Sequence, residues 1–342
     1  MDVVVLRGSA RERGLQQGRL LCNQIRASWE NYLHSPLAGT HEDEFQTVLG
    51  NMLRFLESHF PEVLEELYGV GEGSGLDFDA VVRWNFASAI WTTILCRDAP
   101  TSCSAVAFTD APEGAIVGKN TDLGTQPEYY ALKVVIPDCG IPYMGYGQVG
   151  GPWVEAAINA EGLVIAQASA PTQPNQDGYG MPCLHSSYLA MQRARRVQEA
   201  IDFLGEIVHA GKGSNWMLAD IEGTAVAVER GHDRQMIRTP EDGQIYFTNH
   251  FLTTEMEAVS RPGDENSLGR ITRYRAIFAD EHPEHTLEGL RQTIADHGHP
   301  VGPCQHGPLA YTRYACLLIP QRHEMRLFRG PACTTTAESY FI

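Results

Sequence analysis

The chain has 342 residues and is 43% hydrophobic, which is enough to bury a substantial core and argues against intrinsic disorder. Its formal net charge of −16 disfavours nucleic acid and anionic membranes as partners, because both would repel an acidic surface. An acidic surface would tolerate a cationic amine substrate. The simpler explanation of the negative charge is that it keeps the protein soluble. No long apolar run and no basic, apolar leader are present, and we expect a soluble, cytoplasmic protein.

The eight cysteines do not form the pattern of a disulfide scaffold. They are scattered along a long chain without paired spacing, whereas disulfide-dense domains are small and secreted. We therefore expect reduced thiols. The cysteines lie at positions 22, 96, 103, 139, 183, 304, 316 and 333.

The first third of the chain is predicted to be helical. Leu15 and Ile25 belong to a series of apolar residues at helical spacing over 11–34. The glycine-rich segment GVGEGSG at 69–75 is predicted to be a connecting turn, because no P-loop lysine follows it. Further helices are predicted over 42–58, 61–68 and 78–96.

Beyond residue 102 the sequence predicts strands in runs and helices in separate runs, which is typical of an α+β fold. GYGQVG at 145–150 fits GxGxxG, but another strand follows it instead of a helix, so we expect no dinucleotide site there. The predicted strands are CSAVAFTD, GAIVGKN, YALKVVIPD, YMGYGQVG, WVEAAIN, GLVIAQAS, WMLADIEG, TAVAVERG, RQMIRT, QIYFTNH, YACLLIP and EMRLFRG, with helices at about 184–209, 266–280 and 286–297.

Cys103 lies where the helix-rich part meets the strand-rich part. If the bond between Ser102 and Cys103 is cut, Cys103 carries both a free amine and a thiol. The amine titrates near pH ~8 and the thiol near ~8.5, so the amine can accept the thiol proton at neutral pH. The alternative is a buried strand cysteine that acts only as a small hydrophobic residue.

Short motifs occur in a fixed order along nearly the whole chain: GSARERGLQQG, SCSAVAF, GKNTD, INAEGL, TNH, SLGRITRYR, DHGHP, CQH and GPAC. This series resembles the acyl-coenzyme A:6-aminopenicillanic acid acyltransferase family, which includes β-alanyl-amine hydrolases among the N-terminal-nucleophile hydrolases. The resemblance implies one domain over 1–342, an αββα four-layer sandwich of two antiparallel sheets with an added helical N-terminal segment. It also implies self-cleavage into an α chain of 1–102 and a β chain of 103–342. Family members commonly have Gly before the nucleophile, where this chain has Ser102.

The resemblance implies catalytic roles for residues around Cys103. Asp122 would hold the new amino terminus or orient the thiol, unless it only closes a hairpin. Arg270 would lie beside the nucleophile and lower the thiol pKa. The alternative is that Arg270 is an exposed arginine on a helix, with no catalytic role. Asn249 would stabilise the oxyanion together with the main-chain amide of Asn159. The alternative for Asn159 is that it only forms the turn of a β-hairpin.

Substrate-binding residues are predicted less specifically. Ser214 and Asn215 would line the acyl pocket, although a turn before a strand explains them equally well, and Tyr146 is a third candidate. Lys119 and Asn120 lie near Asp122 in the sequence but carry a less specific signal.

A second group of reactive side chains lies near the C-terminus, and such residues can bind zinc. Their spacing fits neither a zinc finger nor HExxH, and a similar DH and CxH pattern belongs to the family without a required metal. We therefore predict no metal and no other cofactor. The residues are Asp296, His297, His299, Cys304 and His306.

Together these features predict a cysteine amidohydrolase or acyltransferase that acts on N-acyl amines through an acyl-enzyme at Cys103. Hydrolysis is preferred because water is always present, whereas acyl-coenzyme A-dependent transfer would need a basic nucleotide site that the sequence does not indicate. The second alternative is a non-catalytic metal-binding protein that uses the C-terminal His/Cys group. The expected partners are a small amide or thioester and the two chains of the cleaved precursor. The acyl group, the amine and assembly into a homo-oligomer are left open.

Overall fold

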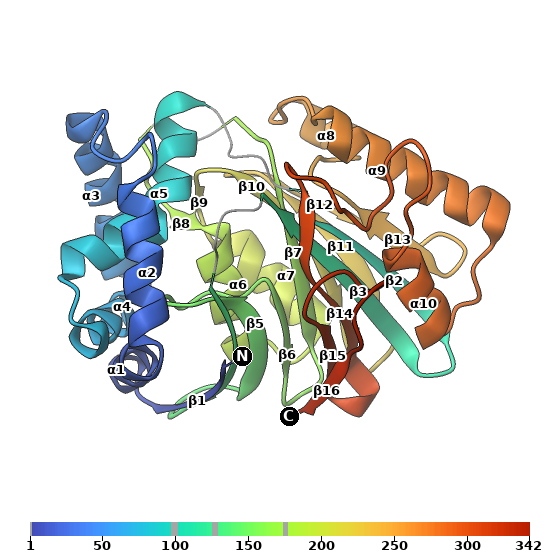
Figure 1. Cartoon of the computed structure of the whole chain (residues 1–342), viewed down its shortest axis with the longest axis horizontal. Helices are drawn as coiled ribbons and strands as arrows, with labels where there is room; N and C mark the ends of the chain where they lie inside the picture. The colour runs from blue at the N-terminus through green and yellow to red at the C-terminus, as the bar shows by residue number, and fades with distance from the viewer. Residues whose placement is uncertain (1, 97–101, 125–128, 174–176) are drawn as a thin grey trace.

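Two large sheets form the centre of the structure, a computed structural model that describes residues 2–96, 102–124, 129–173 and 177–342 (Figure 1). All strand pairs within them are antiparallel except the parallel pair of the first strand. In spatial order, the eight-stranded sheet contains β1 (Asp2–Gly8), β4 (Tyr130–Pro137), β5 (Tyr143–Gln148), β6 (Ala156–Asn159), β7 (Val164–Ala170), β10 (Gly213–Ala219), β11 (Ala225–Arg230) and β12 (Gln235–Arg238). The six-stranded sheet contains β13 (Gln244–Phe247), β2 (Ser104–Ala111), β3 (Gly114–Leu123), β14 (Tyr311–Ile319), β15 (Glu324–Phe328) and β16 (Glu338–Phe341). A small parallel sheet pairs β8 (Met181–Pro182) with β9 (His209–Ala210).

Helices cover the outer face of each large sheet (Figure 1). The eight-stranded sheet shares one apolar cluster with the helices of the first third and with the pair between β8 and β9, and the six-stranded sheet shares another with α9 and α10. The helices on the first side are α1 (Ala10–Leu20), α2 (Cys22–Leu33), α3 (Glu42–His59), α4 (Pro61–Ser74), α5 (Phe78–Leu95), α6 (Cys183–Arg193) and α7 (Val197–Glu206). The later helices are α8 (Thr254–Glu257), α9 (Glu265–Ala276), which continues as a π-helix over Ile277–Glu281, α10 (Leu287–Ile294) and a 3-10 turn at Pro320–Arg322.

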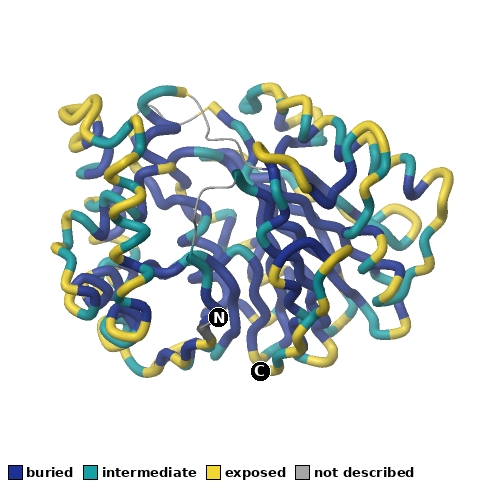
Figure 2. Tube along the Cα trace, in the orientation of Figure 1, coloured by how far each residue is buried: buried dark blue, intermediate teal, exposed yellow. Residues whose placement is uncertain are grey.

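The core between the sheets is built from small and apolar side chains, as expected for two faces that pack closely. Along β2, Ala105 and Ala107 point into this core together with Cys103, whereas Val106 and Phe108 point toward the helical layer beside α9 and α10. Figure 2 shows the sheets as the buried centre and the outer helices as the exposed surface. The predicted α+β sandwich with four layers, α, β, β and α, is therefore confirmed.

In the first part of the chain, three details differ from the sequence prediction, and the helix predicted at about 184–209 is divided into α6 and α7. The helix expected over 11–34 is divided at Leu21 into α1 and α2. The segment 69–75 is not a turn, because all but its last residue belongs to α4. The N-terminal strand β1, which the sequence analysis did not assign, pairs in parallel with β4.

The glycines of α4 allow the helix to approach α1 closely, which explains why they lie inside a helix. A Cβ atom on Gly69 would lie 2.2 Å from the carbonyl oxygen of Arg11, and one on Gly14 would lie 1.9 Å from that of Glu66. Glycine is needed here for space between two backbones, not for a turn.

Two further findings concern the whole chain. Within the described residues, we find no helix with both the length and the apolar content needed to cross a membrane. All eight cysteines are present as free thiols, as the sequence predicted.

We predict that Gly69→Ala lowers the free energy of unfolding by ~1–3 kcal/mol, because the new methyl group must push the α1 backbone away. Gly50→Ala is a matched control within α3, where the nearest atom to an added Cβ is 3.6 Å away. Its effect should be neutral, or stabilising by up to ~1 kcal/mol through helix propensity. Urea denaturation of both variants tests the prediction, and equal stabilities would contradict the close α1–α4 contact.

Candidate active site

Cys103 directly precedes β2 and lies on the face between the sheets, with 8% of its surface exposed. The peptide bond predicted to be cut is held from both sides. The main-chain N–H of Ser102 donates to the carbonyl oxygen of Asp122 at 3.1 Å, and the carbonyl oxygen of Cys103 accepts from Arg270 Nη1 at 2.6 Å. The backbone around this bond is therefore fixed by β3 and α9.

Arg270 connects the nucleophile to the predicted oxyanion residue. Its guanidinium is fully buried, which excludes the alternative of an exposed helix residue. Besides the Cys103 carbonyl, it donates from Nη2 to Asn249 Oδ1 at 2.8 Å and from Nε to Asn266 Oδ1 at 2.7 Å. The amide Nδ2 of Asn249 donates in turn to the carbonyl oxygen of Ser169 at 2.8 Å. The guanidinium thus joins α9 to the segment before β2 and to the segment after β13, and Asn249 extends the connection to β7.

Asp122 is a buried carboxyl group with one oxygen in use. Thr312 Oγ1 donates to Oδ1 at 2.5 Å, and among the described residues no hydrogen bond reaches Oδ2. Burial raises the pKa of Asp122 to about 7, although Arg270, the bond from Thr312 and Lys119 act in the opposite direction. Such a group can accept a proton or bind a new cation near neutral pH.

Lys119 is the cation that lowers the thiol pKa. Burial raises the pKa of Cys103, and the charge of Lys119 is the largest effect that opposes this shift, while Glu155 and Asp122 raise the pKa further. Lys119 is fully buried, and its Nζ donates to Thr121 Oγ1 at 2.8 Å. Arg270, which the sequence analysis expected beside the nucleophile, also interacts electrostatically with Cys103 while it binds the main-chain carbonyl.

Asn159 does not take part in this arrangement, contrary to the sequence prediction. Its main-chain N–H donates to Leu163 at 2.9 Å and closes the hairpin between β6 and β7. Its Nδ2 donates to the carbonyl oxygens of Met191 and Ala194 at 3.0 and 2.8 Å, which holds the end of α6. The hairpin alternative is thus correct. The main chain that lies beside Asn249 is that of Ser169, which the sequence analysis missed.

The three predicted substrate residues are buried and have structural contacts. Ser214 donates to the carbonyl oxygen of Ala168 at 3.2 Å. Asn215 Nδ2 donates to the carbonyl oxygens of Thr248 and His250, on either side of Asn249. Tyr146 packs between the sheets in an aromatic group with Tyr130 and Tyr314. Ser214 and Asn215 thus support neighbouring strands.

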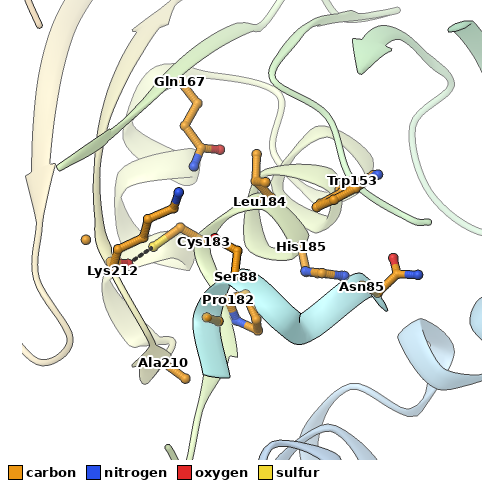
Figure 3. Close-up of a pocket in the computed structure, with 12 residues that line it drawn as sticks. Asn85, Ser88, Trp153, Gln167, Pro182, Cys183, Leu184, His185, Ala210 and Lys212 are labelled. Carbon is orange, nitrogen blue, oxygen red and sulfur yellow. Dashed lines mark hydrogen bonds between the residues drawn. The ribbon is translucent and has the colours of Figure 1, made fainter. Parts of the chain in front are cut away.

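A small pocket with a volume of about 40 Å³ lies on the helical side of the eight-stranded sheet (Figure 3). Lys212 and Gln167 extend toward the same part of it, and the buried ring of His185 lies at its wall, with no hydrogen bond to either nitrogen among the described residues. Cys103 does not line this pocket and lies between the two sheets, on the other side of the eight-stranded sheet. The pocket is therefore separate from the group around Arg270.

Two antiparallel sheets packed face to face between helical layers define an αββα fold of the N-terminal-nucleophile hydrolase type. Residues 109–304 match the family described as acyl-coenzyme A:6-aminopenicillanic acid acyl-transferase, which is more than half of the chain. The protein belongs to this family of enzymes, whose activity is amide hydrolysis or acyl transfer.

Solved structures of similar fold are distant in sequence. A mutant of conjugated bile acid hydrolase from Clostridium perfringens is 11% identical over 70% of this chain and 97% of its own, with a TM-score of 0.42. The N-acylethanolamine-hydrolyzing acid amidase ortholog of Caenorhabditis elegans is 11% identical over 70% and 100%, with a TM-score of 0.46. Penicillin V acylase from Agrobacterium tumefaciens is 11% identical over 70% and 86%, with a TM-score of 0.43.

We predict that Asp122→Asn removes a pH-dependent loss of stability. The native state keeps a proton on Asp122 that the unfolded chain releases near pH ~4, so the free energy of unfolding falls as the pH rises from there to about 7. The difference is on the order of a few kcal/mol, and the Asn variant should not show it. Urea unfolding at pH 5 and pH 8 measures this difference in the free energy of unfolding. Both proteins carry Cys103→Ala, so that the chain is expected to stay unbroken. The exposed Asp138→Asn is the control, and parallel pH dependences for both variants would contradict the assignment.

We predict that Lys119→Met makes the Cys103 thiol less acidic, because it removes the buried cation while keeping a side chain of similar length. Iodoacetamide modification of the Cys103 peptide, followed by mass spectrometry across pH, should shift to higher pH. Lys212→Met removes a cation from the pocket of Figure 3 and should leave the profile unchanged. An unchanged profile in the Lys119 variant would mean that another group activates the thiol.

Proposed function

We propose that this protein is a cysteine amidohydrolase activated by cleavage of its own chain between residues 102 and 103. The observation that carries the proposal is the buried Asp122 carboxyl, whose Oδ2 has no hydrogen bond in the described chain, on the strand paired with the Cys103 segment. A buried carboxylate with one oxygen left without a hydrogen bond is costly, and a newly formed ammonium group at Cys103 would supply a donor to that oxygen.

Cleavage follows from an attack of the Cys103 thiol on the preceding carbonyl carbon. A bond forms between Sγ and the carbonyl carbon of Ser102, the C–N bond breaks, and the thiol proton passes to the nitrogen that becomes the α-amine. Water then hydrolyses this thioester, which leaves a carboxylate on Ser102 and a free thiol on Cys103. The hydrogen bonds from the Ser102 N–H to the Asp122 carbonyl oxygen and from Arg270 to the Cys103 carbonyl oxygen hold both sides of the reacting bond during these steps.

The mature site uses the same sulfur on a substrate amide. The α-amine has taken the thiol proton and lies as the ammonium beside Asp122, so Sγ adds to the substrate carbonyl as the thiolate, and the leaving amine receives that proton from the ammonium when the acyl thioester forms. Asn249 supplies a donor to the oxyanion from Nδ2, the atom that lies beside the Ser169 main chain. Arg270 positions Asn249 through its Oδ1. Water then releases the acid and restores the thiol.

The pocket of Figure 3 does not include the residues around Cys103 and is too small to hold a substrate, so it does not narrow the substrate class. Hydrolysis and transfer to an amine share the same acyl-enzyme. The outcome depends on whether water or an amine reaches the acyl-enzyme and attacks it. A panel of β-alanyl amines, phenylacetyl amides and coenzyme A thioesters, with and without an added amine, separates the two outcomes.

We predict that Cys103→Ala abolishes both self-cleavage and amidase activity. Intact mass spectrometry should show two fragments for the unchanged chain and one for the variant, and the first residues of the larger fragment should read Cys-Ser-Ala-Val. Cys316→Ala is the matched control, because this buried thiol lies in the same core between the sheets. It should keep cleavage and activity. An unbroken chain with full activity would reject the amine as the base.

A further inference from the structure

Four side chains with zinc-binding atoms meet at the C-terminal end of the structure. One ligand atom from each of His297, Cys304, His306 and Cys333 lies within 4.8 Å of every other. They come from three separate segments: the loop after α10, the segment before β14 and the turn after β15. The sequence analysis considered the first three residues with Asp296 and His299, and predicted no metal because their spacing fits no zinc motif and the resembled family has a similar pattern without a required metal.

The distances fit a tetrahedron around one ion. The sulfurs of Cys304 and Cys333 are 3.6 Å apart, and His306 Nε2 lies 3.5 and 3.3 Å from them. The Nε2 atoms of His297 and His306 are 2.9 Å apart. Zinc bonds of ~2.3 Å to sulfur and ~2.0 Å to nitrogen give edges of about 3.8, 3.5 and 3.3 Å. The three edges among Cys304, Cys333 and His306 are within about 0.2 Å of these values, and the contact between the histidines must lengthen by a few tenths of an ångström. His297 lies within 4.8 Å of both sulfurs and must move closer to them to complete the tetrahedron.

We propose that these four residues bind a structural Zn²⁺ ion. Two thiolates and two imidazoles are the ligand set that zinc prefers, and a site with four protein ligands leaves no open position for catalysis. Cys304 is buried, whereas His297 and His306 are exposed, which gives the ion a path to the site. The two thiols, brought together next to a pair of histidine nitrogens, have no other role in the proposed amidase mechanism.

The ion would stabilise the loop that holds Asp122. Directly after the ligand Cys304, the main-chain N–H of Gln305 donates to Thr312 Oγ1 at 2.9 Å, and Thr312 Oγ1 donates to Asp122 Oδ1. The same loop accepts a hydrogen bond from Asn120 Nδ2 at Pro303, at 2.9 Å. Zinc would therefore act on the nucleophile end of β3 through positioning, without touching the reacting atoms.

The test uses the full chain without a histidine tag, purified under reducing conditions. Elemental analysis should find about one zinc per chain. The cobalt-substituted protein should show the visible and charge-transfer bands of a tetrahedral site with two sulfur ligands. Cys333→Ser should lose the zinc and unfold at a lower temperature, whereas the controls Cys139→Ser and His299→Ala should keep both. Zinc binding is also expected in the Cys103→Ala variant, which separates this proposal from the amidase mechanism.

Two results would overturn the proposal. One is a protein that contains no zinc as isolated and takes up neither Zn²⁺ nor Co²⁺ when titrated in the reduced state. The other is a Cys304–Cys333 disulfide in the active protein, seen as a mass lower by about two hydrogens and a linked peptide pair, since an oxidised pair supplies no thiolate ligands.

Discussion

The buried guanidinium of Arg270 is the constraint on which the site depends. A charge that is fully removed from water must have its donors satisfied, because an unpaired buried charge costs several kcal/mol. Here three neutral oxygens accept its hydrogen bonds, from Cys103, Asn249 and Asn266. Each bond fixes a different segment of the chain. The energetic need to satisfy one cation therefore sets the position of the nucleophile relative to the residue proposed for the oxyanion.

Local pattern was sufficient to predict most of the strands and the α+β class, whereas the four-layer sandwich was predicted from the resemblance to the family. Period-two alternation along β2 places Cys103 with Ala105 between the sheets, and the same rule applied to β3 would have placed Lys119 on that face. Contacts between distant segments could not be predicted in this way. Gly69 looks like a turn residue until α1 is packed against it, and Asn159 in a hairpin motif looks catalytic until its amide is seen to be used.

The group at the C-terminus shows the same limit. His297, Cys304 and His306 are close in the sequence, but a tetrahedral site needs a fourth ligand, and Cys333 reaches it only because β14 and β15 form a hairpin that returns the chain. Spacing rules for zinc motifs describe ligands within one or two local turns. A site assembled by sheet topology falls outside them, so the absence of a known motif was weak evidence against a metal.

Charge balance links the proposed maturation to the buried carboxyl. Before cleavage, Arg270 and Lys119 are the cations that act on Asp122, and they do not overcome its burial, since its pKa is raised to about 7. At neutral pH this group is poised between its two forms. A new ammonium group beside it would favour the carboxylate, because an adjacent opposite charge lowers the pKa of an acid. Cleavage would then replace the proton on Asp122 with a charged donor, and the precursor and the mature enzyme would differ in the protonation of one residue as well as in one covalent bond.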